Sequence, residues 1–511
     1  MRPSRKGAAM RMWNERRVGR RALCAVGAAA LCGAVVFACG SDEPPACEGP
    51  GCADATADTG AAVGDAGTDR ATPDVPDAQG GEGGDAVAPD GGADAGCQGQ
   101  PGTLDPGFGD GGVVWIKAPT SGAFAVAVQA DQKIVLGGYT GGSAGKFALA
   151  RLLPSGTPDP SFGTNGIAER AIPGNISPSI RALALQPDGK IVAAGIVRFV
   201  GSESDIVLMR YLTNGEADPS FGAEGVVLTD FSGRSDRASS LAIQPDGRLV
   251  VGGQSGGATA SDNDYAIVRY NVDGSLDASF GVGGKMLVDI RGTADVGGYV
   301  ALAPGGRIAI AGHSLATTSN TSRKDLAMAV VQSSGLLESG FADGGRLVAN
   351  VGGAAGILHQ VVRSLAVDGR GNYLLAGSYG SDFATTRVLT NGVLDPSFGV
   401  DGTSLTDFGG SGDDAFAVLP LANGSVVTVG EGNTAVSPPD TSIQIARHLT
   451  GGATDALFGA SGRGKVVPQA TTNYGSEAAA LSACGVVVVG VWGLDNTTTP
   501  DTAIGVARFR N

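Results

Sequence analysis

The chain has 511 residues and a net charge of −14, which is enough length for several domains or for one large repeat domain. Glycine supplies 85 residues, whereas aromatic residues make up only 5 %. A glycine content this high without a collagen-like period is typical of disordered segments and of folds with many tight turns. Acidic residues outnumber basic ones beyond residue 39, so the basic surface that phosphate binding needs is missing and we expect no nucleic-acid partner.

The N-terminal segment has the pattern of a bacterial export signal. Eight Arg or Lys against one Glu precede an apolar run, Ala22–Phe37, which is too short to span a bilayer comfortably. The run ends in VFACG (Val36–Gly40), which resembles a lipobox, where a small residue precedes the cysteine that is lipidated. We therefore predict a signal peptide over 1–38 and lipidation of Cys39, with an ordinary signal peptide as the alternative. A multi-acyl anchor would hold the protein firmly on the bacterial membrane, at the outer membrane or cell surface rather than the inner membrane.

Residues 39–100 are predicted to be a disordered linker. Asp, Ala, Gly, Pro, Thr and Glu make up almost all of this segment, and thirteen acids face a single Arg. Such a composition buries too little apolar surface to offset the entropy of ordering, and its charges repel one another. We expect an extended spacer that holds the folded part away from the membrane. Cys47 and Cys52 are close enough in sequence to form a small local disulfide.

From residue 104 onward one marker recurs seven times. Its phenylalanine positions are separated by 54, 59, 59, 61, 57 and 60 residues, which is too regular to be chance. The copies are LDPGFGDGG (104–112), PDPSFGTNG (158–166), ADPSFGAEG (217–225), LDASFGVGG (276–284), LESGFADGG (337–345), LDPSFGVDG (394–402) and TDALFGASG (454–462).

Each unit also contains four short runs with the composition of β-strands. One follows the marker, two flank a turn such as QPDGK (Gln186–Lys190), and a fourth precedes the next marker, as in YAIVRY (Tyr265–Tyr270). These runs of four to seven residues are rich in β-branched side chains and bounded by Gly, Pro, Asn and Asp, which predicts strands joined by tight hairpins. No stretch after residue 104 has helical periodicity over the length of a helix.

Four antiparallel strands per unit in seven units predict an all-β fold, a seven-bladed β-propeller of four-stranded antiparallel blades over 101–511. The DPSFGxxG and QPDGKIVxxG elements resemble the delta-60 repeat, a β-propeller family found in secreted bacterial proteins. The resemblance covers essentially all of 104–511. It implies the fold and export, and neither a ligand nor a reaction.

An Arg in the fourth run precedes the Asp of the next marker by eight residues. We predict a structural ion pair within each blade, bidentate where buried, that fixes the marker turn against the strand. A ring of ligand-binding arginines is the alternative. The exception is Val330 and Glu338, where both residues change together. The predicted pairs are Arg151–Asp159, Arg210–Asp218, Arg269–Asp277, Arg387–Asp395 and Arg447–Asp455.

The same spacing predicts how the ring closes. Asp105 has no Arg before it and Arg508 has no Asp after it, so these two residues should pair and place 113–116 beside 504–509 in one blade. This closure would remove the open sheet edges. A disulfide between Cys97 and Cys484 would fit the same geometry.

The sequence contains no catalytic constellation. Three histidines lie at unrelated positions without metal-ligand spacing, and no nucleophile elbow or phosphate loop is present. No cofactor is therefore expected, with the exception of Ca²⁺. Acidic residues precede the fourth run in most units, and in the SDND segment Asp262 and Asp264 are candidate Ca²⁺ ligands. Solvated turn-forming aspartates are the alternative interpretation.

Two functions are compatible with these features. The first is a non-catalytic interaction or structural module of the cell envelope, a monomer that binds a protein or a polysaccharide. The second is an extracellular glycan- or lactone-processing enzyme with its site in the propeller funnel. The first is favoured because the units differ little and none gathers His, Glu and Asp. The residues that line the funnel should discriminate between these two functions, since a fold does not by itself imply a function.

Overall fold

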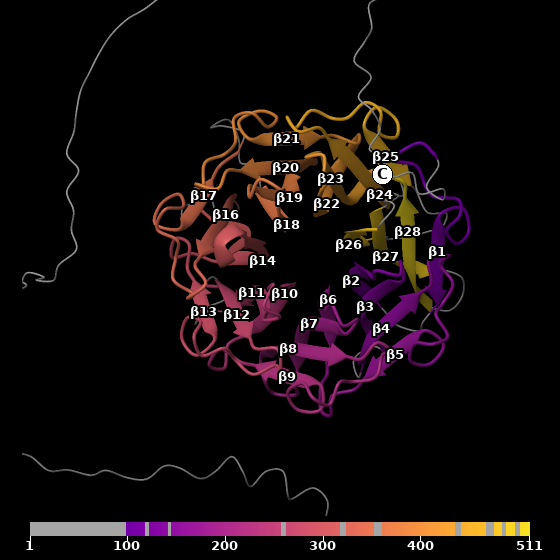
Figure 1. Cartoon of the computed structure of the whole chain (residues 1–511). Helices are drawn as coiled ribbons and strands as arrows, with labels where there is room; N and C mark the ends of the chain where they lie inside the picture. The colour runs from indigo at the N-terminus through magenta and orange to yellow at the C-terminus, as the bar shows by residue number, and fades with distance from the viewer. Residues whose placement is uncertain are drawn as a thin grey trace, which may run out of the picture. The chain divides into compact units, whose positions relative to one another are not determined.

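The structure is a computed structural model. It describes residues 99–511 with gaps at 118–121, 142–144, 257–261, 317–322, 352–359, 435–440, 467–474, 483–486 and 496–500. The described residues lie in one compact unit, Val87–Asn511. Their strands form seven four-stranded antiparallel sheets arranged around a central axis (Figure 1). An all-β propeller of four-stranded antiparallel blades is therefore confirmed.

Six of the sheets are built from consecutive strands, numbered from the innermost strand outward. The first three sheets are β2 (Gly122–Val128), β3 (Ile134–Thr140), β4 (Lys146–Leu152) and β5 (Ile167–Arg170); β6 (Ser179–Leu185), β7 (Ile191–Arg198), β8 (Ser204–Tyr211) and β9 (Val226–Thr229); and β10 (Asp236–Ile243), β11 (Leu249–Ser255), β12 (Asp264–Tyr270) and β13 (Lys285–Val288). The next three are β14 (Asp295–Ala303), β15 (Arg307–Leu315), β16 (Lys324–Val331) and β17 (Arg346–Ala349); β18 (Gln360–Val367), β19 (Tyr373–Tyr379), β20 (Asp382–Val388) and β21 (Thr403–Thr406); and β22 (Gly410–Pro420), β23 (Val426–Thr434), β24 (Thr441–His448) and β25 (Arg463–Val466). A single 3₁₀ turn, η2 (Pro304–Gly306), lies among the described residues.

The last sheet combines the two ends of the propeller. It contains β26 (Gly475–Leu481), β27 (Val487–Asp495), β28 (Asp501–Phe509) and, as its outermost strand, β1 (Val113–Lys117). β1 pairs with β28 from Val113↔Ala507 to Lys117↔Ala503. The innermost strands also form a closed circuit of contacts, in which β26 adjoins β2. The predicted pairing of the first and last strands is therefore present.

The sequence repeat and the structural blade are out of phase by one strand. Each marker lies between the third and fourth strands of one sheet, so the run after it is the outermost strand of that sheet. The next three runs of the same sequence unit then build the following sheet. This offset is why the first unit contributes β1 to the last blade.

The apolar core lies between neighbouring sheets. Val192 and Leu208 of one sheet pack with Val251 and Ala266 of the next, and all four are fully buried. The marker phenylalanines, represented by Phe162, are at most 1 % exposed in all seven copies. Strands buried on both faces read as nearly continuous apolar runs, which explains the high Val, Ile and Ala content of the second and third strands.

The marker turn depends on a residue with positive φ. Gly163 has a φ of +52°, and a Cβ at this position would lie 2.1 Å from the carbonyl oxygen of Ile167. Its N–H donates to Asn214 O of the next sheet at 2.8 Å. Ala342 takes this place in the fifth marker, with a φ of +44° that is uncommon outside glycine, and keeps the bond to the next sheet.

All six predicted Arg–Asp pairs are present, including the pair that closes the ring. In each, the guanidinium Nε donates to one carboxylate oxygen, Oδ2. The distances are 2.8 Å for Arg151–Asp159, Arg210–Asp218 and Arg269–Asp277, 2.7 Å for Arg387–Asp395 and Arg447–Asp455, and 2.9 Å for Arg508–Asp105.

The expected bidentate geometry is wrong for the four most buried pairs. In Arg210, Nη2 donates to the Ser220 hydroxyl of the marker at 3.1 Å, and that hydroxyl donates to Asp218. Where the marker has Gly107 or Leu457 in place of this serine, Nη2 contacts the Asp itself, at 2.6 Å in Arg508 and 2.7 Å in Arg447. The marker serine therefore determines where the second nitrogen points.

Each of these arginines also ties its blade to the next one. Arg210 Nη1 donates to Val272 O, in the following sheet, at 2.5 Å. Its guanidinium lies 4.5 Å from the ring centroid of Phe221, the marker phenylalanine, which adds a cation–π contact. The same set of contacts recurs for Arg151, Arg269 and Arg387. The pair predicted within a blade is thus also a link between blades.

Several predictions fall on residues outside the described ranges. These are the signal peptide (1–38), the lipidated Cys39, nearly all of the linker (39–100), and the cysteines Cys47, Cys52, Cys97 and Cys484. Within the described ranges, no helix has the length and apolar character needed to cross a membrane.

We predict that Asp218→Asn lowers the free energy of unfolding by about 3 kcal/mol, because removing one partner leaves a buried guanidinium without its counter-charge. Urea unfolding and the Tm measure the loss. Glu338→Gln is the matched control, since Glu338 occupies the same place without an arginine and should change stability by about 0.5 kcal/mol or less. Equal effects of the two substitutions would show that the ion pair does not contribute.

The same pairs predict a window of acid sensitivity. Burial alone would raise the pKa of Asp159, but the hydroxyl and N–H of Ser161 and the charges of Arg151 and Lys133 lower it to about 2. A carboxyl whose pKa is lower in the folded state stabilises the fold above its unfolded pKa, 3.8, and that contribution disappears as the pH falls through the folded pKa. The Tm of the wild type should therefore fall between pH 4 and about pH 2. The Tm of Asp159→Asn should be lower at pH 4 and should fall less over this interval. A Tm of the wild type that stays constant across the interval would contradict this.

Candidate functional site

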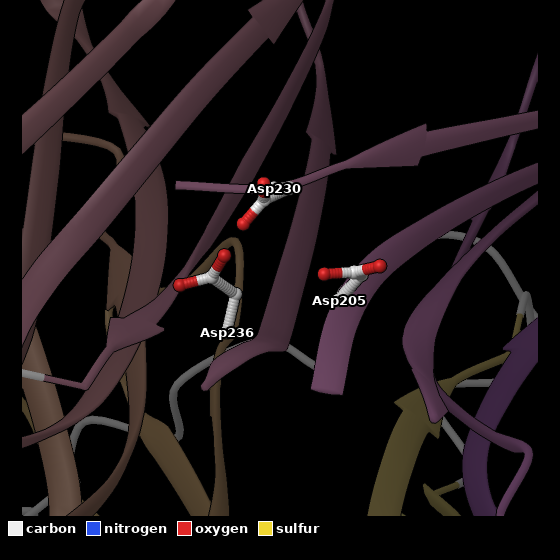
Figure 2. A group of neighbouring side chains, drawn as sticks. All are labelled: Asp205, Asp230 and Asp236. Carbon is white, nitrogen blue, oxygen red and sulfur yellow. The ribbon is translucent and has the colours of Figure 1, made fainter. Parts of the chain in front are cut away.

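Acidic side chains meet where one blade joins the next. Asp205 lies at the start of β8, Asp230 directly follows the outermost strand β9, and Asp236 is the first residue of β10 in the next sheet. One carboxylate oxygen of each lies within 4.8 Å of the others. Figure 2 shows the three carboxylates facing a shared space. We call such a group an Asp triad.

The loop between the second and third members fixes two of the carboxylates. Asp230 Oδ1 accepts a hydrogen bond from the N–H of Gly233 at 2.6 Å, which closes a tight turn. Asp236 Oδ2 accepts from the N–H of Phe231 at 2.6 Å. The backbone thus orients one oxygen of each carboxylate.

Two more junctions contain the same arrangement with the same spacing. In all three, the second Asp follows the first by 25 residues and the third follows the second by 6. The loop sequences DFSGRSD, DIRGTAD and DFGGSGD share Asp at both ends and a glycine in the middle. The other two triads are Asp264, Asp289 and Asp295, and Asp382, Asp407 and Asp413.

The third Asp of each triad is the most buried. Asp236 and Asp295 are fully buried and Asp413 is 1 % exposed. Their Oδ1 atoms have no hydrogen-bond partner among the described residues. The geometry therefore places an unsatisfied oxygen in each of the three junctions, which normally costs stability.

The pKa values of these carboxyls follow from burial and from their neighbours. Burial raises the pKa of Asp295 to about 7, and the charges of Asp289 and Asp264 act in the same direction, although Ser314 and the N–H of Ile290 oppose it. Burial also raises the pKa of Asp236 and of Asp413, and their two triad neighbours add to the effect. Like charges held close together disfavour ionisation of one another.

The structure brings only one of the two predicted Ca²⁺ ligands into a triad. Asp264 belongs to a triad, whereas Asp262 is exposed and does not. The acidic pattern before the fourth run indicates the first Asp of each triad. It does not indicate the other two, which lie 25 and 31 residues further along the chain. The recurrence of DxxGxxD at the same offset from the marker would have indicated them, but the first Asp lies before the marker, in the preceding repeat unit, so the motif alone does not connect the three residues.

Two other junctions neutralise the equivalent positions with basic side chains. At the fourth sheet Asp325 lies between Arg291 and Arg323, both at 2.8 Å, while Asn350 and Gln360 replace the second and third acids. At the first sheet Lys146 takes the place of the first Asp and pairs with Glu169 at 2.6 Å. At these two junctions the acids are therefore paired with basic side chains of the protein.

The central channel is the second candidate site. Each of the seven innermost strands has a β-bulge at the same position, which re-aims one residue of that strand. The bulged residues differ from blade to blade. In chain order they are Phe124, Arg181, Ser239, Gly298, Arg363, Phe416 and Glu477.

A cavity of about 310 Å³ lies among these bulged residues. Three arginines and three aromatic residues line it: Phe124, Arg181, Arg237, Tyr299, Arg363 and Phe416. The Arg181 guanidinium stacks 4.0 Å from the centroid of Phe124, and Arg363 lies 5.4 Å from that of Phe416. Two Arg–aromatic pairs, each formed by residues of adjacent blades, therefore line the cavity.

One acid lies next to this cavity. Arg363 Nε donates to Asp414 Oδ2 at 2.6 Å. Burial raises the pKa of Asp414, and the charge and hydrogen bond of Arg363 work against that increase. The described histidines lie elsewhere, in the core, where burial lowers the pKa of His313 to about 3 and that of His448 to about 4. His359 is outside the described residues.

The chain is similar to one described domain family. Three segments, residues 129–162, 186–221 and 244–280, match the model of a β-propeller domain of unknown function, DUF5122. Each segment runs from the first hairpin of a blade to the marker phenylalanine. No curated protein matches the chain.

Several solved structures are similar at low identity. A protein of unknown function from Dyadobacter fermentans is 11 % identical, covers 78 % of this chain and all of its own, and has a TM-score of 0.39. Regucalcin, a calcium-binding protein from Agrobacterium tumefaciens, is 14 % identical over 62 % of this chain and 85 % of its own, with a TM-score of 0.32. A putative glucose dehydrogenase from Thermus thermophilus is 16 % identical over 66 % of this chain and all of its own, with a TM-score of 0.33. Similarities this weak do not bear on ligand or reaction.

Proposed function

We propose that this protein is a lipid-anchored binding module of the bacterial cell envelope that captures acidic polysaccharide in its central channel. The observation that carries the proposal is the cavity lined by Arg181, Arg237 and Arg363 together with Phe124, Tyr299 and Phe416. It is a cationic, aromatic pocket in a chain with a net charge of −14.

The chemistry of the lining favours a sugar carboxylate. Guanidinium groups bind carboxylates through paired hydrogen bonds, and aromatic rings offer flat apolar area against which a sugar ring packs. The described residues that line the cavity include three arginines and no Asp or Glu, and the nearest described acid, Asp414, is paired with Arg363. A volume of about 310 Å³ is at the lower end for small-ligand sites, which suits one or two sugar residues of a chain.

The anchor is part of the proposal. Lipidation of Cys39 and an acidic spacer over 39–100 would hold the propeller outside the cytoplasm, where polysaccharide is present. A tethered binder needs only modest affinity per site, because many anchored copies engage one polymer together.

Arg181→Gln and Arg363→Gln should each weaken binding of oligogalacturonate to the full-length protein in detergent at least tenfold. A charge-assisted hydrogen bond contributes roughly 1.5–3 kcal/mol, and about 1.4 kcal/mol corresponds to a factor of ten. Isothermal titration calorimetry provides the measurement, with neutral oligogalactan of the same length as the comparison ligand.

Arg198→Gln is the control variant, since Arg198 is exposed at the end of β7 and does not line the cavity. Its affinity should equal that of the wild type. The proposal fails if the neutral and acidic chains bind equally, or if Arg181→Gln binds as the wild type does. Shortened products in the titrated mixture would instead favour a glycan-processing enzyme, with Asp414 beside Arg363 as the acid to test.

Cys39→Ala should release the protein from membranes. The substitution removes the thiol that would carry the lipid, so the exported chain should appear in the soluble fraction and should not incorporate labelled palmitate. Cys47→Ala should remain in the membrane fraction. An unlipidated wild-type chain would contradict the anchor and leave the channel proposal to be judged by the binding data alone.

A further inference from the structure

The three Asp triads have the features of cation sites. Each gathers three carboxylates from three separate elements: the third strand of one sheet, the loop after its outermost strand, and the first strand of the next sheet. In the triad of Asp382, Asp407 and Asp413 no Lys or Arg ion pair is present among the described residues, and in that of Asp264, Asp289 and Asp295 Arg234 approaches Asp264 at 3.5 Å. Asp205 of the remaining triad has a further contact within the protein. Lys285 and Arg346 contact backbone carbonyls of Asp230 and Asp289, not their carboxylates.

The unpartnered oxygens provide independent support. Asp236, Asp295 and Asp413 are buried, each holds its Oδ2 with a backbone N–H, and each leaves Oδ1 without a hydrogen bond. Ser255, Ser314 and Gln444 lie beside Asp236, Asp295 and Asp413, respectively, and act to lower the pKa of these carboxyls, yet none completes a hydrogen bond to Oδ1. Repeated at three junctions, a buried free acceptor is not an accident of one loop.

The remaining described junctions show what happens when a triad is incomplete. Asp325 lacks acidic partners and is bound by two arginines, and Lys146 replaces the first Asp where Glu169 remains. At these two junctions the chain supplies its own cation. Where three acids meet at the Asp264 and Asp382 triads, the described residues supply one arginine and none, respectively, which points to a cation from solution.

We propose that each Asp triad binds one Ca²⁺, three per chain, and that the ions clamp adjacent blades together. Calcium accepts flexible coordination by carboxylate oxygens at 2.3–2.6 Å, so oxygens that share an ion can lie up to about 5 Å apart, consistent with the 4.8 Å limit of each triad. Magnesium demands a tighter octahedron and gives up its water reluctantly. Water and loop carbonyls would complete the calcium shell.

The sites should be weak and structural. Three carboxylates without a preformed cage suit dissociation constants on the order of 10⁻⁴–10⁻³ M, the range of extracellular calcium modules. An ion that binds only the folded state raises the Tm as its concentration exceeds the dissociation constant. These sites are separate from the channel cavity, because none of the nine triad residues lines it.

The test is a calcium titration of the full-length protein in detergent after removal of metal with EDTA. Equilibrium dialysis with CaCl₂ should give three ions per chain, and the Tm should rise by several degrees at 10 mM CaCl₂ but not at equal ionic strength of NaCl. Asp236→Asn, Asp295→Asn and Asp413→Asn should each reduce the stoichiometry by one. All three variants should fold in EDTA, because the change removes a buried charge that has no counter-ion.

Asp325→Asn is the matched control, since its carboxylate is already held by Arg291 and Arg323, and it should leave the stoichiometry at three. The proposal is overturned if the wild type binds no calcium at 10 mM, if Asp236→Asn, Asp295→Asn and Asp413→Asn retain three ions, or if MgCl₂ gives the same stoichiometry and Tm increase. Loss of glycan binding in the channel variants has no bearing on these readings.

Discussion

The propeller depends on one guanidinium group in each of six of its seven blades. In the best-formed copies a single arginine donates to the marker Asp, to the marker Ser and to a carbonyl of the next blade, and lies over the marker Phe. It has five N–H donors in a rigid plane and cannot lose its charge, so lysine could not reproduce this set. The contact is buried, which makes an unpaired member costly, and it therefore fixes both the turn within a blade and the spacing between blades.

Much of the fold could be predicted from the sequence because its determinants are local and repeated. Arg and Asp lie eight residues apart, the hairpin turns are short, and the strands are contiguous apolar runs. Comparison of the copies also shows where the Arg–Asp spacing is not kept, at Val330 and Glu338. It shows in addition that the first Asp and the last Arg have no partner in sequence and can pair when the ring closes. The bidentate expectation was wrong because it ignored Ser161 and its equivalents, which compete for the second guanidinium nitrogen.

The candidate sites were harder to predict because they combine residues from different blades. The third Asp of a triad lies one blade beyond the first, so its role depends on the ring geometry and not on a motif within one unit. The channel residues vary because the seven equivalent bulges carry five different residue types, Phe, Arg, Ser, Gly and Glu, and their proximity exists only after closure. Phe124 and Arg181 are 57 positions apart, yet their side chains stack. Repetition therefore reveals the scaffold more readily than the surfaces that act on a ligand.

The position of β1, the outermost strand of the last blade, affects the order in which the blades fold. β1 is the first strand of the propeller to be synthesised, and its partner β28 is the last, with Asp105 and Arg508 separated by 403 residues. Closing so long a loop carries an entropic cost that local hairpins do not, so the final blade forms after the others. Until then β1 and β28 both present unpaired sheet edges. A chain interrupted before its last strand would carry six blades and would leave β1 without a strand partner.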